Sequence, residues 1–441
     1  MQELDFFGKQ ISTGNHTFMK KILVIGSGGR EHAICEQFKK SPKLEKIFVL
    51  PGNAGIAEIA EIVEGISIDE HQKIIDFCKK ENIDFVFVGP EQPLVAGLVD
   101  DLQKAGIRAF GPSKKASQLE GSKIFMKKIA IDNSVPTAAY EVFFEKDPAV
   151  AFAKKLGFPC VIKADGLAAG KGVIIAQNLQ EAEENIAEFF LGKFGDAGKK
   201  IIIEEFLDGF EVSYFVICDG KNFVSLGFAH DHKKVGENET GPNTGGMGTF
   251  APSPLVSKKM EAEIIESTIK PTLRGLEKEG CPFVGILFAG LMVGKNGPKL
   301  LEFNARFGDP ETQVILPRIK SDFIDLIEAA IDGNLDKVEV EFDETQKLVC
   351  VVMCANGYPE GYQKGTEIKN LEAAKKVAGV KILHAGTAKK DGKIVANGGR
   401  VLNVVASADS FETARNKAYE AVNLIDWKEG FCRRDIASKA C

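Results

Sequence analysis

The 441-residue sequence lacks the features of several protein classes. No apolar run approaches the ~18 residues that a membrane-spanning helix requires. The nine cysteines are scattered and none forms a Cys-x-x-Cys pair, which is typical of a reduced, cytoplasmic protein. Basic residues are not in excess, since 56 Lys and Arg against 62 Asp and Glu give a net charge of −6. We therefore expect a cytoplasmic protein that binds neither nucleic acid nor membrane.

The first 18 residues lack the basic and apolar segments of a signal peptide. We expect residues 1–18 to be an appended or disordered leader, with Met19 as a candidate start. The remaining chain exceeds the size of one hydrophobic core and should divide into about three domains.

Strand and helix patterns alternate along the first part of the chain. Apolar runs at 20–25, 47–50, 84–88 and 108–110 each end in a turn rich in Gly, Pro or Asn, and a helix pattern covers 70–80. This alternation predicts a parallel sheet whose turns gather in one ligand-binding crevice. Antiparallel strands follow, at 160–164 and 173–176 and again beyond residue 200. The polar segment 231–248 reads as a long functional loop, and a last β-rich region ends in one helix near 410–424.

The most informative segment is 301–312, LEFNARFGDPET. Because a strand alternates its faces, Glu302, Asn304 and Arg306 share one side of it. Carboxylate and amide oxygens suit a hard cation such as Mg²⁺, and a guanidinium suits a phosphoryl group. The alternative is a solvated strand face with a surface ion pair.

Two glycine loops resemble nucleotide-binding motifs without matching them. Gly26-x-Gly28 follows the first strand, but Glu31 stands where a dinucleotide site needs a third glycine. That turn could hold one phosphate with help from Arg30, or be a turn without a ligand. The loop from Gly166 to Gly172 is one residue too short for a Walker A motif and joins two strands. It fits a glycine hairpin that closes over phosphates, or a plain surface hairpin.

Nine segments in order resemble the phosphoribosylamine–glycine ligase family of ATP-grasp enzymes, over about 19–437. They are GGREH (28–32), PGNAG (51–55), VGPE (88–91), LEGSK (119–123), VIKADGLAAGKGV (161–173), EEFLDG (204–209), GPNTGGMG (241–248), EFNARFGDPETQ (302–313) and NGGRV (397–401). The resemblance implies a multidomain α/β and α+β fold. Residues 19–120 would form a Rossmann-like substrate domain, 121–335 an ATP-grasp domain with a lid at about 136–208, and 336–441 a small β-rich domain.

The resemblance also implies a reaction, in which ATP, glycine and 5-phosphoribosylamine give glycinamide ribonucleotide, ADP and phosphate through glycyl phosphate. Glu302 and Asn304 would hold Mg²⁺ or Mn²⁺, and Arg306 and Lys163 would be catalytic. The residues implied in ATP binding are Lys123, Lys163, Gly166, Gly170, Lys171, Glu204, Glu205, Phe206, Leu207 and Glu211. Those implied in binding the other substrates are Gly28, Gly29, Arg30, Asn53, Glu91, Asn243, Thr244, Gly245, Gly246, Asp309, Pro310 and Glu311. We expect a monomer.

Three alternatives remain at this stage. Another ATP-grasp ligase would share the ATP site and differ in its acid or amine. A nucleotide sensor would bind ATP without turnover, although Glu302, Asn304 and Arg306 argue against that. A dehydrogenase that uses NAD is disfavoured by Glu31.

Overall fold

The N-terminal part is a parallel sheet, as predicted. A computed structural model describes residues 19–167, 172–192 and 195–441, so the expected leader lies outside the described residues. Five parallel strands follow the order β3-β2-β1-β4-β5. Their bounds are β1 (Lys20–Gly26), β2 (Leu44–Pro51), β3 (Glu61–Ile62), β4 (Phe85–Val88) and β5 (Ala109–Phe110). The strand order reverses between β1 and β4, and ligands of such sheets bind at this point.

The helices of this region are α1 (Gly29–Phe38), α2 (His71–Glu81), α3 (Glu91–Ala96) and α4 (Leu98–Lys104). One face of the sheet packs on α2 and α4. The other face packs on α1 and on α12 (Phe323–Ile331), whose Phe323 ring lies 4.9 Å from that of Phe38. Asp322 begins α12 by accepting the backbone N–H groups of Ile324 and Asp325. This helix therefore joins the N-terminal sheet to the next one.

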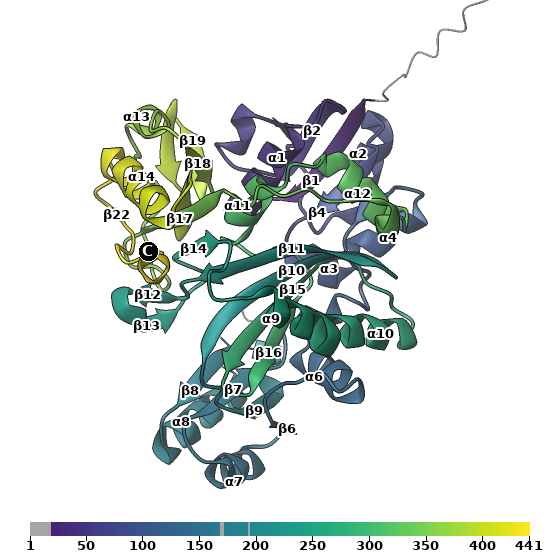
Figure 1. Cartoon of the computed structure of the whole chain (residues 1–441), viewed down its shortest axis with the longest axis vertical. Helices are drawn as coiled ribbons and strands as arrows, with labels where there is room; N and C mark the ends of the chain where they lie inside the picture. The colour runs from purple at the N-terminus through teal and green to yellow at the C-terminus, as the bar shows by residue number, and fades with distance from the viewer. Residues whose placement is uncertain (1–18, 168–171, 193–194) are drawn as a thin grey trace, which may run out of the picture.

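The central sheet has nine strands and extends into the C-terminal region (Figure 1). Its main path is β16-β15-β10-β11-β14-β17-β21-β18. The bounds are β10 (Phe210–Asp219), β11 (Phe223–Asp231), β14 (Gly248–Ala251), β15 (Val284–Gly294), β16 (Gly297–Asn304), β17 (Lys347–Ala355), β18 (Val380–His384) and β21 (Arg400–Ala408). β22 (Gly430–Phe431) pairs with β17. Because β14 pairs with β17, the C-terminal strands continue the central sheet.

Helices pack on both faces of this central sheet. One face packs on α5 (Gln118–Gly121), α6 (Lys123–Asp132), α9 (Lys258–Ile264) and α10 (Lys270–Lys278). The other face shares one core with α12, α11 (Thr312–Ile315) and α14 (Phe411–Leu424). The segment that follows β16 therefore passes between two cores, where its polar side chains are partly enclosed.

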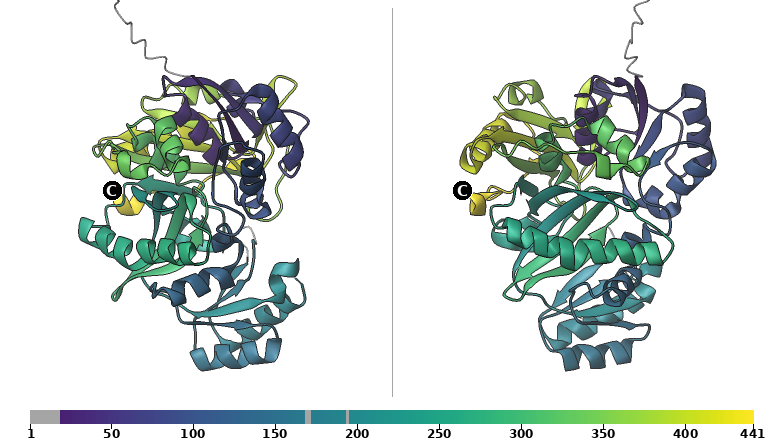
Figure 2. Two further views of the ribbon diagram at one scale, coloured as in Figure 1. Left: turned by 90° about the vertical axis from the view of Figure 1, so that its right-hand side faces the viewer. Right: turned by 45° about the vertical axis from the view of Figure 1, so that its right-hand side comes forward.

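A second, smaller sheet stands apart with its own core. Its order is β6-β9-β7-β8, with β6 (Tyr140–Phe143), β7 (Cys160–Ala164), β8 (Val173–Ala176) and β9 (Ile201–Glu205). Helices α7 (Lys146–Leu156) and α8 (Leu179–Phe190) cover one face. Figure 2 shows this unit at the opposite end of the molecule from the N-terminal sheet. This unit lies within residues 136–208, the range that the resemblance implies for the lid.

Three expectations were wrong in detail. The segment 231–248 is not an irregular loop, because it contains the ribbon of β12 (Lys234–Gly236) and β13 (Thr240–Asn243). The chain after α14 does not end at that helix, because β22 and a short 3₁₀ turn (Ser438–Ala440) follow. The C-terminal region also contains a second helix, the short α13 (Leu371–Ala374), whereas its ribbon of β19 (Thr387–Lys390) and β20 (Lys393–Ala396) agrees with the expected β-rich region. No described helix is long and apolar enough to cross a membrane.

Candidate active site

The polar face predicted for 301–312 is present. Phe303, Ala305 and Phe307 are buried in the core, while Glu302, Asn304 and Arg306 lie on the other side. β16 ends at Asn304, so Arg306 sits just beyond the strand. Burial opposes the charged form of Glu302, but the ammonium groups of Lys233, Lys163 and Lys123 lower its pKa. Glu302 therefore stays ionised among three cations.

Arg306 is held almost completely by the protein. Nε donates to Glu91 at 3.2 Å and Nη1 to the Phe307 carbonyl at 3.0 Å. Nη2 donates to Glu120 at 2.9 Å and to Asn304 Oδ1 at 3.3 Å. Burial opposes its charge, but Glu120 and Glu91 raise the pKa of the guanidinium. Of the five N–H groups of an arginine, one on Nη1 finds no acceptor among the described residues.

Lys163 and Glu204 meet below this face, on neighbouring strands β7 and β9. Lys163 Nζ lies 2.9 Å from Glu204 and 3.4 Å from the Leu301 carbonyl. Lys127 of α6 lies 3.2 Å from the other Glu204 oxygen and donates to Thr137. Burial lowers the pKa of Lys127 to about 8, against the attraction of Glu204. Both oxygens of the Glu204 side chain are therefore engaged in ion pairs, so only its backbone remains for the implied contact with ATP.

The other residues predicted to bind ATP lie around these strands. Lys123 Nζ donates to the Gly166 carbonyl at 3.3 Å. Glu205 accepts from Lys299 at 2.8 Å and from the Ala139 backbone at 3.2 Å. Phe206 is exposed and Leu207 is half-buried. Glu211 forms an ion pair with Lys233. Gly170 and Lys171 lie outside the described residues.

The glycine turn after β1 is filled by carboxylates of the protein itself. The backbone N–H of Gly28 donates to Glu31 at 2.7 Å, and the backbone of Arg30 helps to lower the pKa of the Asp309 carboxylate. A Cβ on Gly89, at the end of β4, would lie 2.3 Å from Glu31 Oε1. The switch point of the sheet is thus occupied by the Glu31 side chain. A phosphate at this turn would have to displace a carboxylate.

Asn53 stabilises the second turn and has no free hydrogen-bonding group. Its Nδ2 donates to the carbonyls of Ser27 and His384, both at 2.8 Å. Its Oδ1 accepts from the backbone of Gly55 and Ile56, both at 2.9 Å. All four hydrogen bonds available to an asparagine are made. The predicted substrate role of Asn53 finds no support in this geometry, which instead fixes the turn.

The structure brings the loop 243–246 against the turn at Asp309. Gly246 adopts φ +117°, and a Cβ there would lie 2.4 Å from Pro310 Cδ. Arg400 of β21 donates to the carbonyls of Gly245 and Gly246 and to that of Asp309. Asn243 and Thr244 are half-buried beside them. Tyr358 accepts the Gly245 N–H at 3.0 Å.

Two buried carboxylates complete this part of the site. Burial raises the pKa of both Asp231 and Glu311, and repulsion by Glu311 raises that of Asp231 further. Ser213 donates to Glu311 at 3.1 Å, whereas Asp231 Oδ1 is enclosed without a hydrogen-bond partner among the described residues. The pair therefore favours binding of one positive charge or retention of one proton.

Sequence reasoning missed five of these residues: Glu120, Lys127, Asp231, Lys233 and Arg400. Glu120 and Arg400 were inside recognised motifs, LEGSK and NGGRV, but no role was assigned to them. Lys233 and Asp231 flank His232 in the segment taken as a loop. Charge did not distinguish them, because Lys234, Glu237 and Glu239 lie in the same Gly-rich segment.

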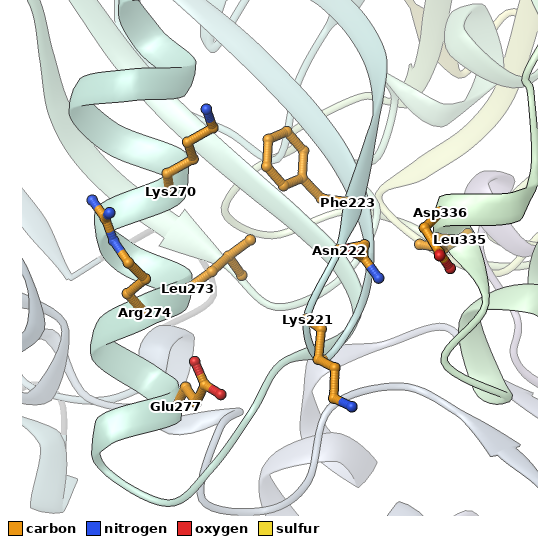
Figure 3. Close-up of a pocket in the computed structure, with 10 residues that line it drawn as sticks. Lys221, Asn222, Phe223, Lys270, Leu273, Arg274, Glu277, Leu335 and Asp336 are labelled. Carbon is orange, nitrogen blue, oxygen red and sulfur yellow. The ribbon is translucent and has the colours of Figure 1, made fainter.

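No set of three or more His, Cys, Asp and Glu side chains in the described ranges could bind a metal ion alone. Glu302 and Asn304 supply two oxygen donors, which suits a cation that takes its other ligands from phosphates and water. The pocket drawn in Figure 3, of about 440 Å³, is a different place. It lies between α10 and the β10–β11 hairpin, and no described member of the predicted site lines it.

Comparisons with known proteins match the same enzyme family along most of the chain. Family models of phosphoribosylglycinamide synthetase match residues 20–120 (N domain), 121–312 (ATP-grasp A domain) and 348–439 (C domain). The phosphoribosylamine–glycine ligase of Brucella melitensis is 52% identical over 420 residues, which cover 95% of this chain and 98% of that protein.

Solved structures agree. The phosphoribosylamine–glycine ligase of Thermotoga maritima has a TM-score of 0.81 at 34% identity, covering 94% of this chain and 99% of that one. Biotin carboxylase of Campylobacter jejuni has a TM-score of 0.69 at 17% identity, covering 94% of each chain, and shares the fold. The chain belongs to the phosphoribosylamine–glycine ligase family, the ATP-grasp enzymes that ligate glycine with ATP in purine biosynthesis.

Proposed function

We propose that the polar face at the end of β16 is the catalytic centre of this ligase. The observation that carries the proposal is the convergence of Glu302, Asn304 and Arg306 with the cations Lys123, Lys163 and Lys233. A divalent cation, Mg²⁺ or Mn²⁺, would be held by Glu302 and Asn304 together with ATP phosphates. When bound, it would neutralise charge that develops on the transferring phosphoryl group.

The chain's own residues then bind and orient the reactants. Lys123 and Lys163 bind ATP phosphates, and the backbone of 204–207 with Glu211 binds the nucleoside. Arg306 stabilises the phosphoryl group as it passes to the glycine carboxylate. Because a carboxylate is a poor acyl donor, this phosphorylation makes the carbonyl carbon reactive. The amine of 5-phosphoribosylamine attacks that carbon and phosphate leaves, so no nucleophilic side chain is required.

Glycine and 5-phosphoribosylamine would bind on the side of the site that is away from ATP. Asp309, Pro310 and Glu311 border the position proposed for glycine, and the loop 243–246 with Arg400 borders 5-phosphoribosylamine. The Gly28–Arg30 turn and Asn53 are engaged within the protein, so we propose that they shape this crevice and do not grip the phosphate directly. Glu91 remains a candidate substrate contact because it stands beside Arg306. A monomeric, cytoplasmic enzyme stays the expectation.

The intermediate is tested with glycine whose carboxylate carries heavy oxygen. Transfer through glycyl phosphate moves one carboxylate oxygen of glycine into the inorganic phosphate. Mass spectrometry of that phosphate after turnover with ATP and fresh 5-phosphoribosylamine should find one labelled oxygen per molecule. Unlabelled phosphate alongside normal formation of product would contradict the acyl phosphate route.

A further inference from the structure

Glu120 braces the end of β16 with both of its carboxylate oxygens. Oε1 accepts from Arg306 Nη2 at 2.9 Å, and Oε2 accepts the backbone N–H of Ala305 at 2.8 Å. Its side chain is 8% exposed and comes from the short helix α5. One carboxylate thus fixes the guanidinium and also the peptide between Asn304 and Ala305. No other carboxylate among the described residues contacts both.

Stability alone does not account for this arrangement. Burial raises the pKa of Glu120 in spite of the nearby Arg306 charge, so the ionised carboxylate is costly to keep there. A buried ion pair of this kind is often no more stabilising than apolar side chains of the same volume. The pair instead fixes the orientation of the Arg306 side chain, because a planar guanidinium held on two edges by Glu120 and Glu91 has little freedom to rotate.

The orientation bears on the single N–H of Arg306 that remains free. Four of the five N–H groups are engaged by Glu91, Glu120, Asn304 and Phe307, and the fifth is on Nη1. Rotation of the guanidinium plane would redirect that donor. If Glu120 no longer attracted Nη2, the ion pair with Glu91 would draw the group toward the N-terminal sheet.

We propose that Glu120 is a positioning residue of the ligase reaction, which sets the guanidinium of Arg306 and the peptide after Asn304 in their working geometry. This inference rests on the catalytic role proposed for Arg306. Glu120 itself contacts no reacting atom and acts through its two partners.

Replacement by glutamine is the sharpest change. Both partners of Glu120 are donors, so the amide N–H₂ of Glu120→Gln must face one of them. We expect kcat to fall by roughly 10²-fold, because misplacing a catalytic group typically lowers the rate by this factor. The KM for ATP should change little. Glu328→Gln is the matched control. Glu328, on α12 and away from the site, also accepts from two cations, Arg108 at 2.6 Å and Lys20 at 3.0 Å. This variant should lower the thermal midpoint and leave kcat unchanged.

A double-mutant cycle with Arg306→Lys tests whether Glu120 acts through Arg306. We expect Glu120→Gln to have a much smaller effect on kcat in the Arg306→Lys background than in the wild type. Equal effects in both backgrounds would overturn the inference while the role of Arg306 stands. A normal kcat for Arg306→Lys would overturn both. Glu120→Asp, which keeps the charge but is too short to reach both partners, replaces the glutamine variant if that does not fold, with the same expectations.

Discussion

Arg400 ties the C-terminal region to Asp309 by side chain and backbone together. Its Nη2 lies 3.3 Å from Asp309 Oδ2, and its Nη1 donates to the Asp309 carbonyl at 2.6 Å. Burial opposes both charges, yet each residue favours the ionised form of the other, so the pKa of Asp309 is lowered and that of Arg400 raised. The same guanidinium also contacts the 243–246 loop. The C-terminal strands therefore contribute directly to the candidate active site.

Arg400→Lys should weaken use of 5-phosphoribosylamine more than use of ATP. Lysine keeps the charge but cannot hold three carbonyls and a carboxylate with one planar group. We expect kcat/KM for 5-phosphoribosylamine to fall by about 10-fold or more, while the KM for ATP stays near the wild-type value. Steady-state kinetics with each substrate varied would decide. A rise confined to the KM for ATP would mean that the Arg400 contacts serve the nucleotide half of the site.

Glu302→Gln should abolish most turnover in a protein that still folds. The change removes the charge that Lys123, Lys163 and Lys233 surround, and with it a ligand for the divalent cation. Loss of such a group in a phosphoryl-transfer site costs roughly 10²-fold or more in kcat. Glu266→Gln, at an exposed pair with Lys270, is the control and should be silent. Normal kcat for Glu302→Gln at saturating Mg²⁺ would remove Glu302 from the mechanism.

The sequence predicted those features that depend on local patterns. The alternation of apolar runs and turns predicted four of the five strands of the parallel sheet, all but the short β3, and a period of two placed Glu302, Asn304 and Arg306 together. Both are properties of consecutive residues, so they can be seen without a structure. A dehydrogenase that uses NAD was disfavoured in the same way by Glu31, whose side chain the structure places at the switch point.

Contacts between distant segments could not be predicted in this way. Glu120 is 186 residues from Arg306, and Arg400 is 91 residues from Asp309, and no periodicity relates them. The ribbon of β12 and β13 was missed for the same reason. Its short strands do not alternate, and it is held by Arg433, which donates to Glu239 at 2.8 Å and to the Lys234 carbonyl at 2.9 Å. Local propensity gave no sign of a strand there.

His32 should make stability fall in mild acid. Its Nδ1 accepts the His384 backbone N–H at 2.9 Å, and burial, with His384 beside it, lowers its pKa to about 3. The unfolded chain binds this proton near the ordinary pKa of about 6.5, so the folded state is disfavoured increasingly as pH falls below that value. Denaturant unfolding from about pH 7 to about pH 5 should show a shallower decline for His32→Gln than for the wild type. Parallel declines would show that His32 takes up its proton in the folded state.

ADP release measured with and without each acceptor tests the central claim most directly. The account predicts rapid release only when ATP, glycine and freshly made 5-phosphoribosylamine are all present, with glycinamide ribonucleotide formed in equal amount. Replacing glycine by alanine, or 5-phosphoribosylamine by ribose 5-phosphate, should abolish formation of the amide. Equal ADP release with a different acid or amine, or nucleotide binding without turnover in the complete mixture, would contradict it.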